Sequence, residues 1–230
     1  MDAGAPPAVG DGAVFVPSVD QSLWAFNLAD GSGASALQRF RNEAQAAGRL
    51  MHPGIVAVYD SGEMDDGTLY FIMEFIKGTD VSEMVEKQGR LSSAHAMAIT
   101  AHVCDALAYA HEMGVVHRDI KPANVLIATD GRPMLLDFNL SQDLKLKRHS
   151  TDELIGGTIP YMAPEQLAAY ASQARSEDPR GDLYALGVIL YESVTGRAPF
   201  AVPSGQPESC LPELIAARNQ LPGLRSINSS

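Results

Sequence analysis

Apolar and polar positions change their spacing about one third of the way along the chain. Residues 13–16 (AVFV) and 22–28 (SLWAFNL) predict two short strands. Apolar residues at intervals of three and four predict a helix over residues 35–50. The runs 55–59 and 69–76 predict a second strand pair, because Asp66-Gly67 between them is a turn signal. The first part is therefore expected to be a small sheet with one helix.

Beyond residue 80 the spacing is mostly helical. Helices are predicted over 81–87 and 93–113, followed by a hairpin around Asp130-Gly131 and a loop of nearly 30 residues. Asp178-Pro179 predicts an N-cap and a first helical position for a buried helix that ends at Thr195. Strands first and helices second predict an α+β fold in two lobes, because sheet and helices are segregated along the chain. The expected division is a disordered tail at 1–12, an N-terminal lobe at 13–76 and a helical C-terminal lobe at 77–230.

Composition narrows the function classes. The 230 residues are 46% hydrophobic, which is enough to build a core, and 28 acidic against 17 basic residues give a net charge of -11. This balance argues against a nucleic-acid partner, since phosphate backbones bind basic faces. The N-terminus has neither a signal peptide nor an anchor, no run has the length of a membrane span, and two cysteines suit a reducing compartment. We therefore expect a cytoplasmic protein with no membrane segment.

The segment His117–Asn124 (HRDIKPAN) carries the strongest chemical signal. Its six specified positions would match a fixed pattern by chance on the order of once in 10⁸ starts, if each residue type has about 5% usage. Phosphoryl transfer needs a carboxylate for the attacking hydroxyl, a cation beside the moving phosphoryl group and an oxygen ligand for magnesium. Asp119, Lys121 and Asn124 supply these three groups in that order.

HRDIKPAN resembles the catalytic loop of protein kinases, and Lys121 two residues after Asp119 resembles the serine/threonine branch. The resemblance implies ATP and magnesium as cofactors and a protein Ser/Thr hydroxyl as substrate. It also implies a structural role for His117 and a regulatory role for Arg118, which would receive a phosphate from the activation loop at Ser150 or Thr151.

Two later segments extend the resemblance. Asp137-Phe138-Asn139 stands where kinases carry DFG, so Asp137 would hold magnesium together with Asn124, and Phe138 would be structural. Asn in place of the glycine tolerates a positive φ, although it can bias the backbone. GTIPYMAPE resembles the end of a kinase activation segment, with a regulatory Thr158 and a structural Glu165, and Asp182 would bind the backbone of the catalytic loop.

Upstream, residues 38–63 resemble the kinase regulatory helix and the strand after it. Glu43 would pair with the lysine that positions ATP. Around the nucleotide, the backbones of Glu74 and Ile76 would bind adenine, Asp80 would meet the ribose, and Leu126 would contact the cofactor.

The resemblance breaks at both ends of the chain. No lysine precedes the Glu43 helix, and Trp24 occupies or adjoins the place of the ATP lysine, while Gly10-Asp11-Gly12 is half of a glycine-rich loop. Residues 1–34 are open to two interpretations, a degenerate kinase start or a foreign strand pair of the kind found in quinoprotein-type propellers. After residue 218 the family continues through helices that bring an arginine to the APE glutamate, so Glu165 is expected to lack that partner.

The sequence thus predicts a two-lobed serine/threonine kinase fold, incomplete in its N-terminal lobe and truncated in its helical lobe, with impaired phosphotransfer. The alternatives are a catalytically inactive pseudokinase or docking module and a non-functional fragment.

Overall fold

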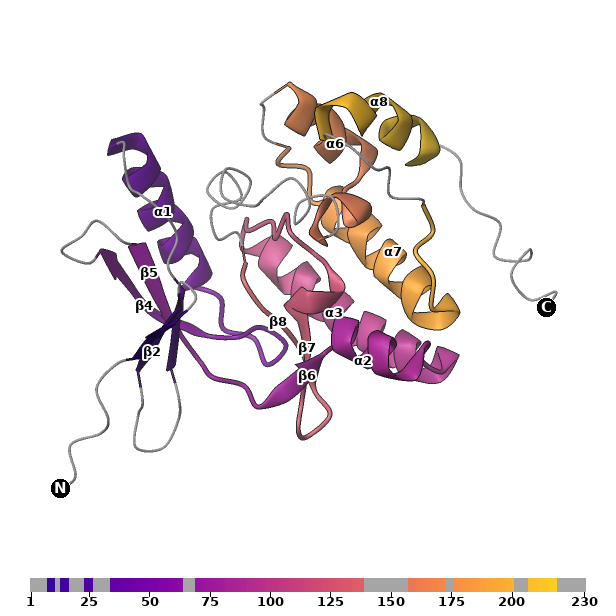
Figure 1. Cartoon of the computed structure of the whole chain (residues 1–230). Coiled ribbons are helices and arrows are strands. Elements are labelled where there is room, and N and C mark those ends of the chain that lie inside the picture. Colours follow the sequence, from indigo (N-terminus) through magenta and orange to yellow (C-terminus); the bar gives the residue numbers. More distant parts are fainter. Residues whose placement is uncertain are drawn as a thin grey trace.

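A computed structural model describes residues 8–10, 13–16, 23–26, 34–63, 69–138, 157–172, 176–200 and 207–218. A sheet with one helix forms the N-terminal lobe, and most of the helices form the C-terminal lobe, with a small three-stranded sheet between them (Figure 1). The α+β organisation in two lobes that the residue pattern predicts is present. Among the described residues, no helix is long and apolar enough to cross a membrane.

The N-terminal lobe is an antiparallel sheet of five strands in the order β1-β2-β3-β5-β4. Its elements are β1 (Ala8–Gly10), β2 (Ala13–Val16), β3 (Leu23–Phe26), α1 (Ala34–Ala47), β4 (Val58–Glu63) and β5 (Leu69–Met73). Phe40 and Ala44, one helical turn apart on α1, are buried in one cluster with Val56, Phe71 and Met73. The rings of Phe40 and Phe71 lie 4.5 Å apart, so an aromatic contact fixes the helix on the sheet.

Two expectations for this lobe are corrected. Among the described residues, regular structure is present already at Ala8 and not only from Ala13, because β1 pairs with β2 from Ala8↔Phe15 to Gly10↔Ala13. The strand expected over 55–59 begins only at Val58 and extends to Glu63, through residues expected to form a loop. The backbone before Val58 is already used by another strand, since the Val56 amide donates to the Leu135 carbonyl oxygen.

The C-terminal lobe begins with a strand and continues mostly as helices. Its elements are β6 (Gly78–Asp80), α2 (Val81–Gln88), α3 (Ser93–Glu112), η1 (Pro122–Asn124), β7 (Val125–Ala128), β8 (Pro133–Leu135), η2 (Ile159–Tyr161), α6 (Pro164–Ala171), α7 (Arg180–Thr195) and α8 (Pro207–Arg218). Strands β6, β7 and β8 pair in that order. Apolar residues of α3 and α7 supply about half of the buried residues of the main core, including Val103, Leu107, Leu186 and Ile189. These two helices pack against each other and contribute more buried residues to that core than any other element.

The start of α7 differs from the expected one. Pro179 occupies the N-cap position, and α7 begins at Arg180. Asp178 lies before the cap and accepts a hydrogen bond from the Arg180 amide at 2.9 Å. Proline precedes the first helical residue here, so the sequence signal was placed one residue too early.

The other end of α7 requires a glycine. Gly196 has a φ of 69°, and a Cβ built on it would lie 2.1 Å from the Gly89 carbonyl oxygen. Both the left-handed backbone and this close approach exclude a side chain. The turn brings α7 against the start of α3, where the Leu91 amide donates to the Ser193 carbonyl oxygen.

Candidate active site

Asp182, in the first turn of α7, holds the loop that precedes η1. Its Oδ2 accepts hydrogen bonds from the His117 amide and from Nε2 of His111, and its Oδ1 accepts from the Arg118 amide, all at 2.8 Å. The side chain of Asp182 is 1% exposed. A buried carboxylate is tolerated because three donors replace its lost water, which is the backbone contact expected from the sequence.

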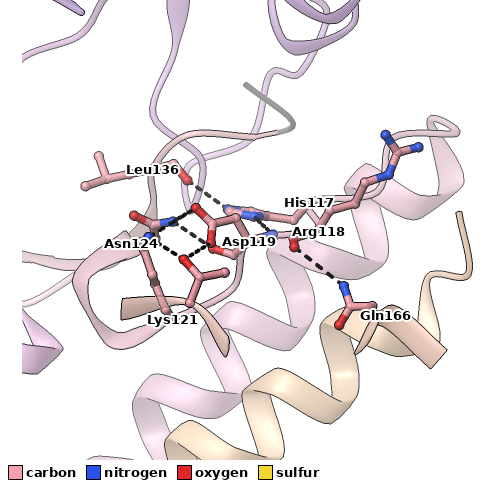
Figure 2. Close-up of polar contacts among 8 residues, drawn as sticks. His117, Arg118, Asp119, Lys121, Asn124, Leu136 and Gln166 are labelled. Atoms are coloured by element: carbon pink, nitrogen blue, oxygen red, sulfur yellow. Dashed lines mark hydrogen bonds and ion pairs between the residues drawn. The ribbon is translucent and has the colours of Figure 1, made fainter. Parts of the chain in front are cut away.

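His117 fixes the loop from inside. The Asp119 amide donates a hydrogen bond to Nδ1 of His117 at 3.3 Å. The ring proton of His117 is therefore on Nε2, which donates to the Leu136 carbonyl oxygen at 2.8 Å. The imidazole packs against Phe138 with 4.6 Å between ring centroids. His117 and Phe138 thus connect the catalytic loop to the segment that carries Asp137. Figure 2 shows the hydrogen bond from His117 to Leu136 beside the polar cluster of Asp119.

Asp119 lies at the centre of a small polar cluster. Asn124 Nδ2 donates to the Asp119 carbonyl oxygen at 2.7 Å and to Oδ2 at 3.2 Å, and Lys121 Nζ lies 3.3 Å from the same Oδ2 (Figure 2). The Thr158 hydroxyl donates to Asp119 Oδ1 and accepts from Lys121 Nζ, each at 3.2 Å. Thr158 is 34 residues beyond Asn124, so this contact joins the activation segment to the catalytic loop.

Strain in the backbone is confined to two non-glycine positions among the described residues. Arg118 has a φ of 68° and Asp137 a φ of 58°, and both adjoin the predicted catalytic groups. A left-handed arginine is costly and persists only where the surroundings enforce it, here through the bond from its amide to Asp182. Aspartate adopts this conformation more readily.

Asn124 and Asp137 carry side-chain oxygens of the kind that magnesium prefers. The Leu136 amide donates to the Asn124 carbonyl oxygen at 3.0 Å, which holds the residue before Asp137 against Asn124. Because Asn124 uses its amide nitrogen on Asp119, its side-chain oxygen is left for another partner. No group of three or more His, Cys, Asp or Glu side chains forms a metal cage in the described part of the chain. Two oxygen donors fit Mg²⁺, which takes its other ligands from water and phosphate.

The residues predicted around the nucleotide come from several elements. Glu43 lies on α1 and is 7% exposed, and its sequence neighbours on that helix, Phe40 and Ala44, belong to the apolar cluster of the lobe. The Glu74 amide donates to the Ala57 carbonyl oxygen, so it pairs within the lobe. Ile76 packs against the same apolar cluster as Phe40.

Strands β6 and β7 carry two further residues predicted to contact the nucleotide. Asp80 and Leu126 face each other in the pairing of these strands. Asp80 Oδ1 also accepts from the Glu83 amide at 2.9 Å and caps α2. A cap is therefore the observed role of Asp80, in addition to the predicted contact with ribose. Trp24, in the expected place of the lysine, pairs with Met73 across β3 and β5.

The activation segment contains both predicted and unexpected contacts. Glu165 is exposed in the first turn of α6. Its neighbour Gln166 is buried, accepts from the Ala163 amide at 2.9 Å and donates to the Arg118 carbonyl oxygen at 3.5 Å. Arg118 Nη2 lies 3.4 Å from Glu177. Ser150 and Thr151, predicted to be phosphorylated, lie outside the described residues, as does Asn139.

Sequence reasoning missed Gln166 and His111. His111 precedes the HRD motif by one turn and a short loop, and Gln166 directly follows the APE motif. Their proximity to the motifs was the available signal, but neither residue type has a spacing that distinguishes a buried partner from a surface residue.

Comparisons with known proteins agree with this geometry. The family described as "Protein kinase domain" matches residues 21–220. A probable serine/threonine-protein kinase of Corynebacterium efficiens is 42% identical over 168 residues, which cover 71% of this chain and 25% of that protein. Serine/threonine-protein kinase PknB of Mycobacterium tuberculosis is 38% identical over 167 residues, covering 70% and 26%. The chain thus spans about a quarter of the length of the curated relatives it matches.

Solved structures give the same result. The crystal structure of the Mycobacterium tuberculosis PknI kinase domain superposes with a TM-score of 0.67 at 26% identity, covering 94% of this chain and 75% of that one. A mutant form of the same domain gives a TM-score of 0.65 and covers 95% and 90%. These similarities confirm the two-lobed fold predicted from the sequence.

Proposed function

This chain belongs to the protein kinase family, and from that membership and the assembled catalytic loop we propose that it acts as an ATP-dependent protein serine/threonine kinase with impaired activity. The observation that carries the proposal is the Asp119 cluster. Both carboxylate oxygens of Asp119 are oriented by Lys121, Asn124 and Thr158, within a loop fixed by Asp182. A solvated surface loop would not need a buried acceptor for two consecutive amides.

In the proposed reaction, Asp119 orients the Ser/Thr hydroxyl of a protein substrate and accepts its proton. Lys121 places a positive charge beside the phosphoryl group, and Asn124 and Asp137 hold the magnesium ion. Magnesium bound with ATP neutralises the charge that develops on the phosphate oxygens. Thr158 keeps Asp119 and Lys121 in one arrangement, which is what positioning catalysis requires.

The nucleotide is proposed to lie between the lobes. The backbones of Glu74 and Ile76 bind adenine, Asp80 meets the ribose, and Leu126 contacts the cofactor. Glu43 is the acidic member of the expected ion pair with the ATP lysine, and the lysine itself is missing. The same proposal includes phosphorylation of Ser150 or Thr151, with Arg118 binding the phosphate group.

A pseudokinase or docking module is the second candidate, because one observation favours it. The first lysine of the chain is Lys77, beyond the strand where the family carries its ATP lysine, and Trp24 pairs with Met73 there instead. An indole donates one hydrogen bond and carries no charge for phosphate oxygens. The retention of Asp119, Lys121, Asn124 and Asp137 together favours the enzyme.

A protein partner in the cytoplasm fits the composition. The net charge of -11 disfavours nucleic acid, and the cysteines of the described residues, Cys104 and Cys210, are free thiols.

Magnesium dependence tests the proposed function directly. We expect ATP with magnesium to raise the unfolding temperature and ATP with EDTA to leave it unchanged, since Asp137 and Asn124 remain while the lysine does not. The variant Asp137→Ala is expected to lose the response. Asp130→Ala is the matched control, because Asp130 lies exposed at the turn between β7 and β8 and pairs only with Arg132. Equal stabilisation in magnesium and EDTA, or an unchanged response in Asp137→Ala, would contradict the proposal.

A further inference from the structure

Helix α8 packs directly against the segment that follows Thr158. Leu211 and Leu214 of α8 are buried in one cluster with Ile159, Met162 and Leu167. Figure 1 shows α8 beside α6, away from the N-terminal lobe. The last residue of this helix, Arg218, is 3% exposed.

The guanidinium of Arg218 is committed to backbone oxygens. Nε donates to the Met162 carbonyl at 3.1 Å, and Nη2 donates to the carbonyls of Ile159 and Pro160, each at 3.0 Å. The cation also lies 4.7 Å from the centre of the Phe200 ring. No carboxylate pairs with Arg218 within the described residues. Burial lowers the pKa of this arginine, which is the expected effect of removing a cation from water.

The three carbonyl groups belong to η2 and its C-terminal end. The Ile159 carbonyl also accepts from the Met162 amide within the turn, whereas carbonyls at the end of such a turn lack helical partners. A planar guanidinium can bind several of these oxygens at once. A lysine ammonium has a similar charge but lacks the rigid fork. The arrangement therefore needs an arginine specifically.

The turn that Arg218 holds begins at Thr158. The Tyr161 amide donates to the Thr158 carbonyl oxygen at 3.1 Å, and the Met162 amide donates to that of Ile159 at 3.2 Å. The Thr158 hydroxyl in turn contacts both Asp119 and Lys121. One hydrogen-bonded turn thus separates the Arg218 guanidinium from the catalytic carboxylate.

We infer that Arg218 is a positioning residue, which fixes the η2 turn and thereby holds the Thr158 hydroxyl against Asp119 and Lys121. This inference rests on the proposed function for its catalytic meaning, since Thr158 matters to the reaction only if Asp119 is the base. It also changes the expectation for this end of the fold. An arginine does anchor the activation segment, but it comes from α8 and binds carbonyl groups and not Glu165.

Hydrogen exchange and methyl NMR on the whole chain test the inference without nucleotide. In Arg218→Lys we expect the Tyr161 and Met162 amides to exchange at least about tenfold faster, because their turn loses its outer support. Amides of α3 should exchange at their original rates. The matched control is Arg197→Lys, which makes the same exchange at an exposed position after α7.

A spectroscopic signature separates positioning from simple destabilisation. The γ2 methyl signal of Thr158 should move in Arg218→Lys toward its position in Asp119→Ala, which breaks the Thr158 contact from the other side. It should remain at the original position in Arg197→Lys. Arg218→Met, which removes the charge, should move the signal at least as far.

Unchanged Thr158 and amide signals in Arg218→Lys would overturn the inference, and so would an equal acceleration of exchange in α3. If Arg218→Met does not fold, Arg218→Lys decides the question alone. If the signals move as expected while ATP with magnesium gives no stabilisation, the positioning role of Arg218 stands and the proposed activity fails.

Discussion

The two sides of the proposed nucleotide site differ in how their functional residues are held. On the C-terminal side, Asp119, Lys121 and Asn124 come from six consecutive residues and bind one another or Thr158. On the N-terminal side, Glu43 and Glu74 come from α1 and from the segment after β5. The place of the lysine lies in β3, where Trp24 pairs with Met73 through its backbone.

This difference explains how one functional residue can be absent while the fold persists. Strand pairing uses N–H and C=O groups, so β3 can join the sheet whatever side chain Trp24 carries. In the HRD loop, the side chains proposed to act in catalysis are also hydrogen-bond partners of one another. A change there disturbs the fold and the chemistry together.

The largest expected effect on stability comes from replacing Asp182, which holds the HRD loop on the C-terminal side of the site. Asp182→Ala leaves the His117 and His111 donors and the Arg118 amide without their acceptor. At about 1–3 kcal/mol for each buried unsatisfied donor, the free energy of unfolding should fall by roughly 3 kcal/mol or more. Urea denaturation measures the loss.

Asp178→Ala is the control for this change. Asp178 lies just before the same helix, but its ion pair with Arg180 is on the surface and is screened by water. We expect Asp178→Ala to lower the free energy of unfolding by at most about a third as much as Asp182→Ala does, because it removes only a screened ion pair and the acceptor of the Arg180 amide. A loss in Asp178→Ala as large as that in Asp182→Ala would show that Asp182 acts only as part of the helix start.

The contrast between the lobes also shows what sequence reasoning can and cannot reach. The resemblance of RGDLYALG to the central helix of the family predicted the bonds from Asp182 to the backbone of the HRD loop. HRDIKPAN placed Asp119, Lys121 and Asn124 within six residues, so their proximity in space was predictable too. The strand after His52 was placed too early, because the pairing of Val56 with Leu135 depends on a strand about 80 residues away. Local propensity does not contain that contact.

Arg218 illustrates the same limit. Its helix was expected from the sequence, but the sequence alone does not distinguish a buried arginine from a solvated one. Only the packing of α8 on Ile159 and Met162 decides between them. Regular elements, motif residues and the Asp182 contact that the family resemblance implies are thus predictable here, whereas the contacts of Val56 and Arg218 require the folded chain.

The next largest expected effect concerns the N-terminal side of the proposed nucleotide site, where the ATP lysine is missing. Removing one preorganised donor from a developing charge costs about 10² to 10³ in rate in other enzymes, or about 2.7 to 4 kcal/mol. We therefore expect phosphotransfer to a protein substrate at or below detection for residues 1–230. Trp24→Lys alone should not restore it, since a lysine without its glycine loop is not held in place. A radiometric assay with ATP and a generic protein substrate provides the measurement.

Grafting a complete glycine loop and lysine strand ahead of Ser35, together with the C-terminal helices of the family, should restore activity that Asp119→Asn then abolishes. This graft tests whether the C-terminal side is intact. Robust phosphorylation by the original chain, lost in Asp119→Asn, would instead show that another group does the work of the lysine.

The smallest expected effect concerns two helix caps, one at the nucleotide side and one away from it. Asp80 accepts from the Glu83 amide at the start of α2, and Ser92 accepts from the His95 amide at the start of α3. Replacing either residue by alanine should lower the free energy of unfolding by about 1 kcal/mol, because each substitution removes the acceptor of one orphan amide.

Only Asp80→Ala should also weaken the stabilisation by ATP with magnesium, since Asp80 is the predicted ribose contact. Asp80→Asn should keep the cap, because asparagine is an equally good N-cap residue. If Asp80→Ala and Ser92→Ala lose the same stability and respond equally to nucleotide, Asp80 is a cap alone, and the nucleotide side retains one functional residue fewer than its sequence implies.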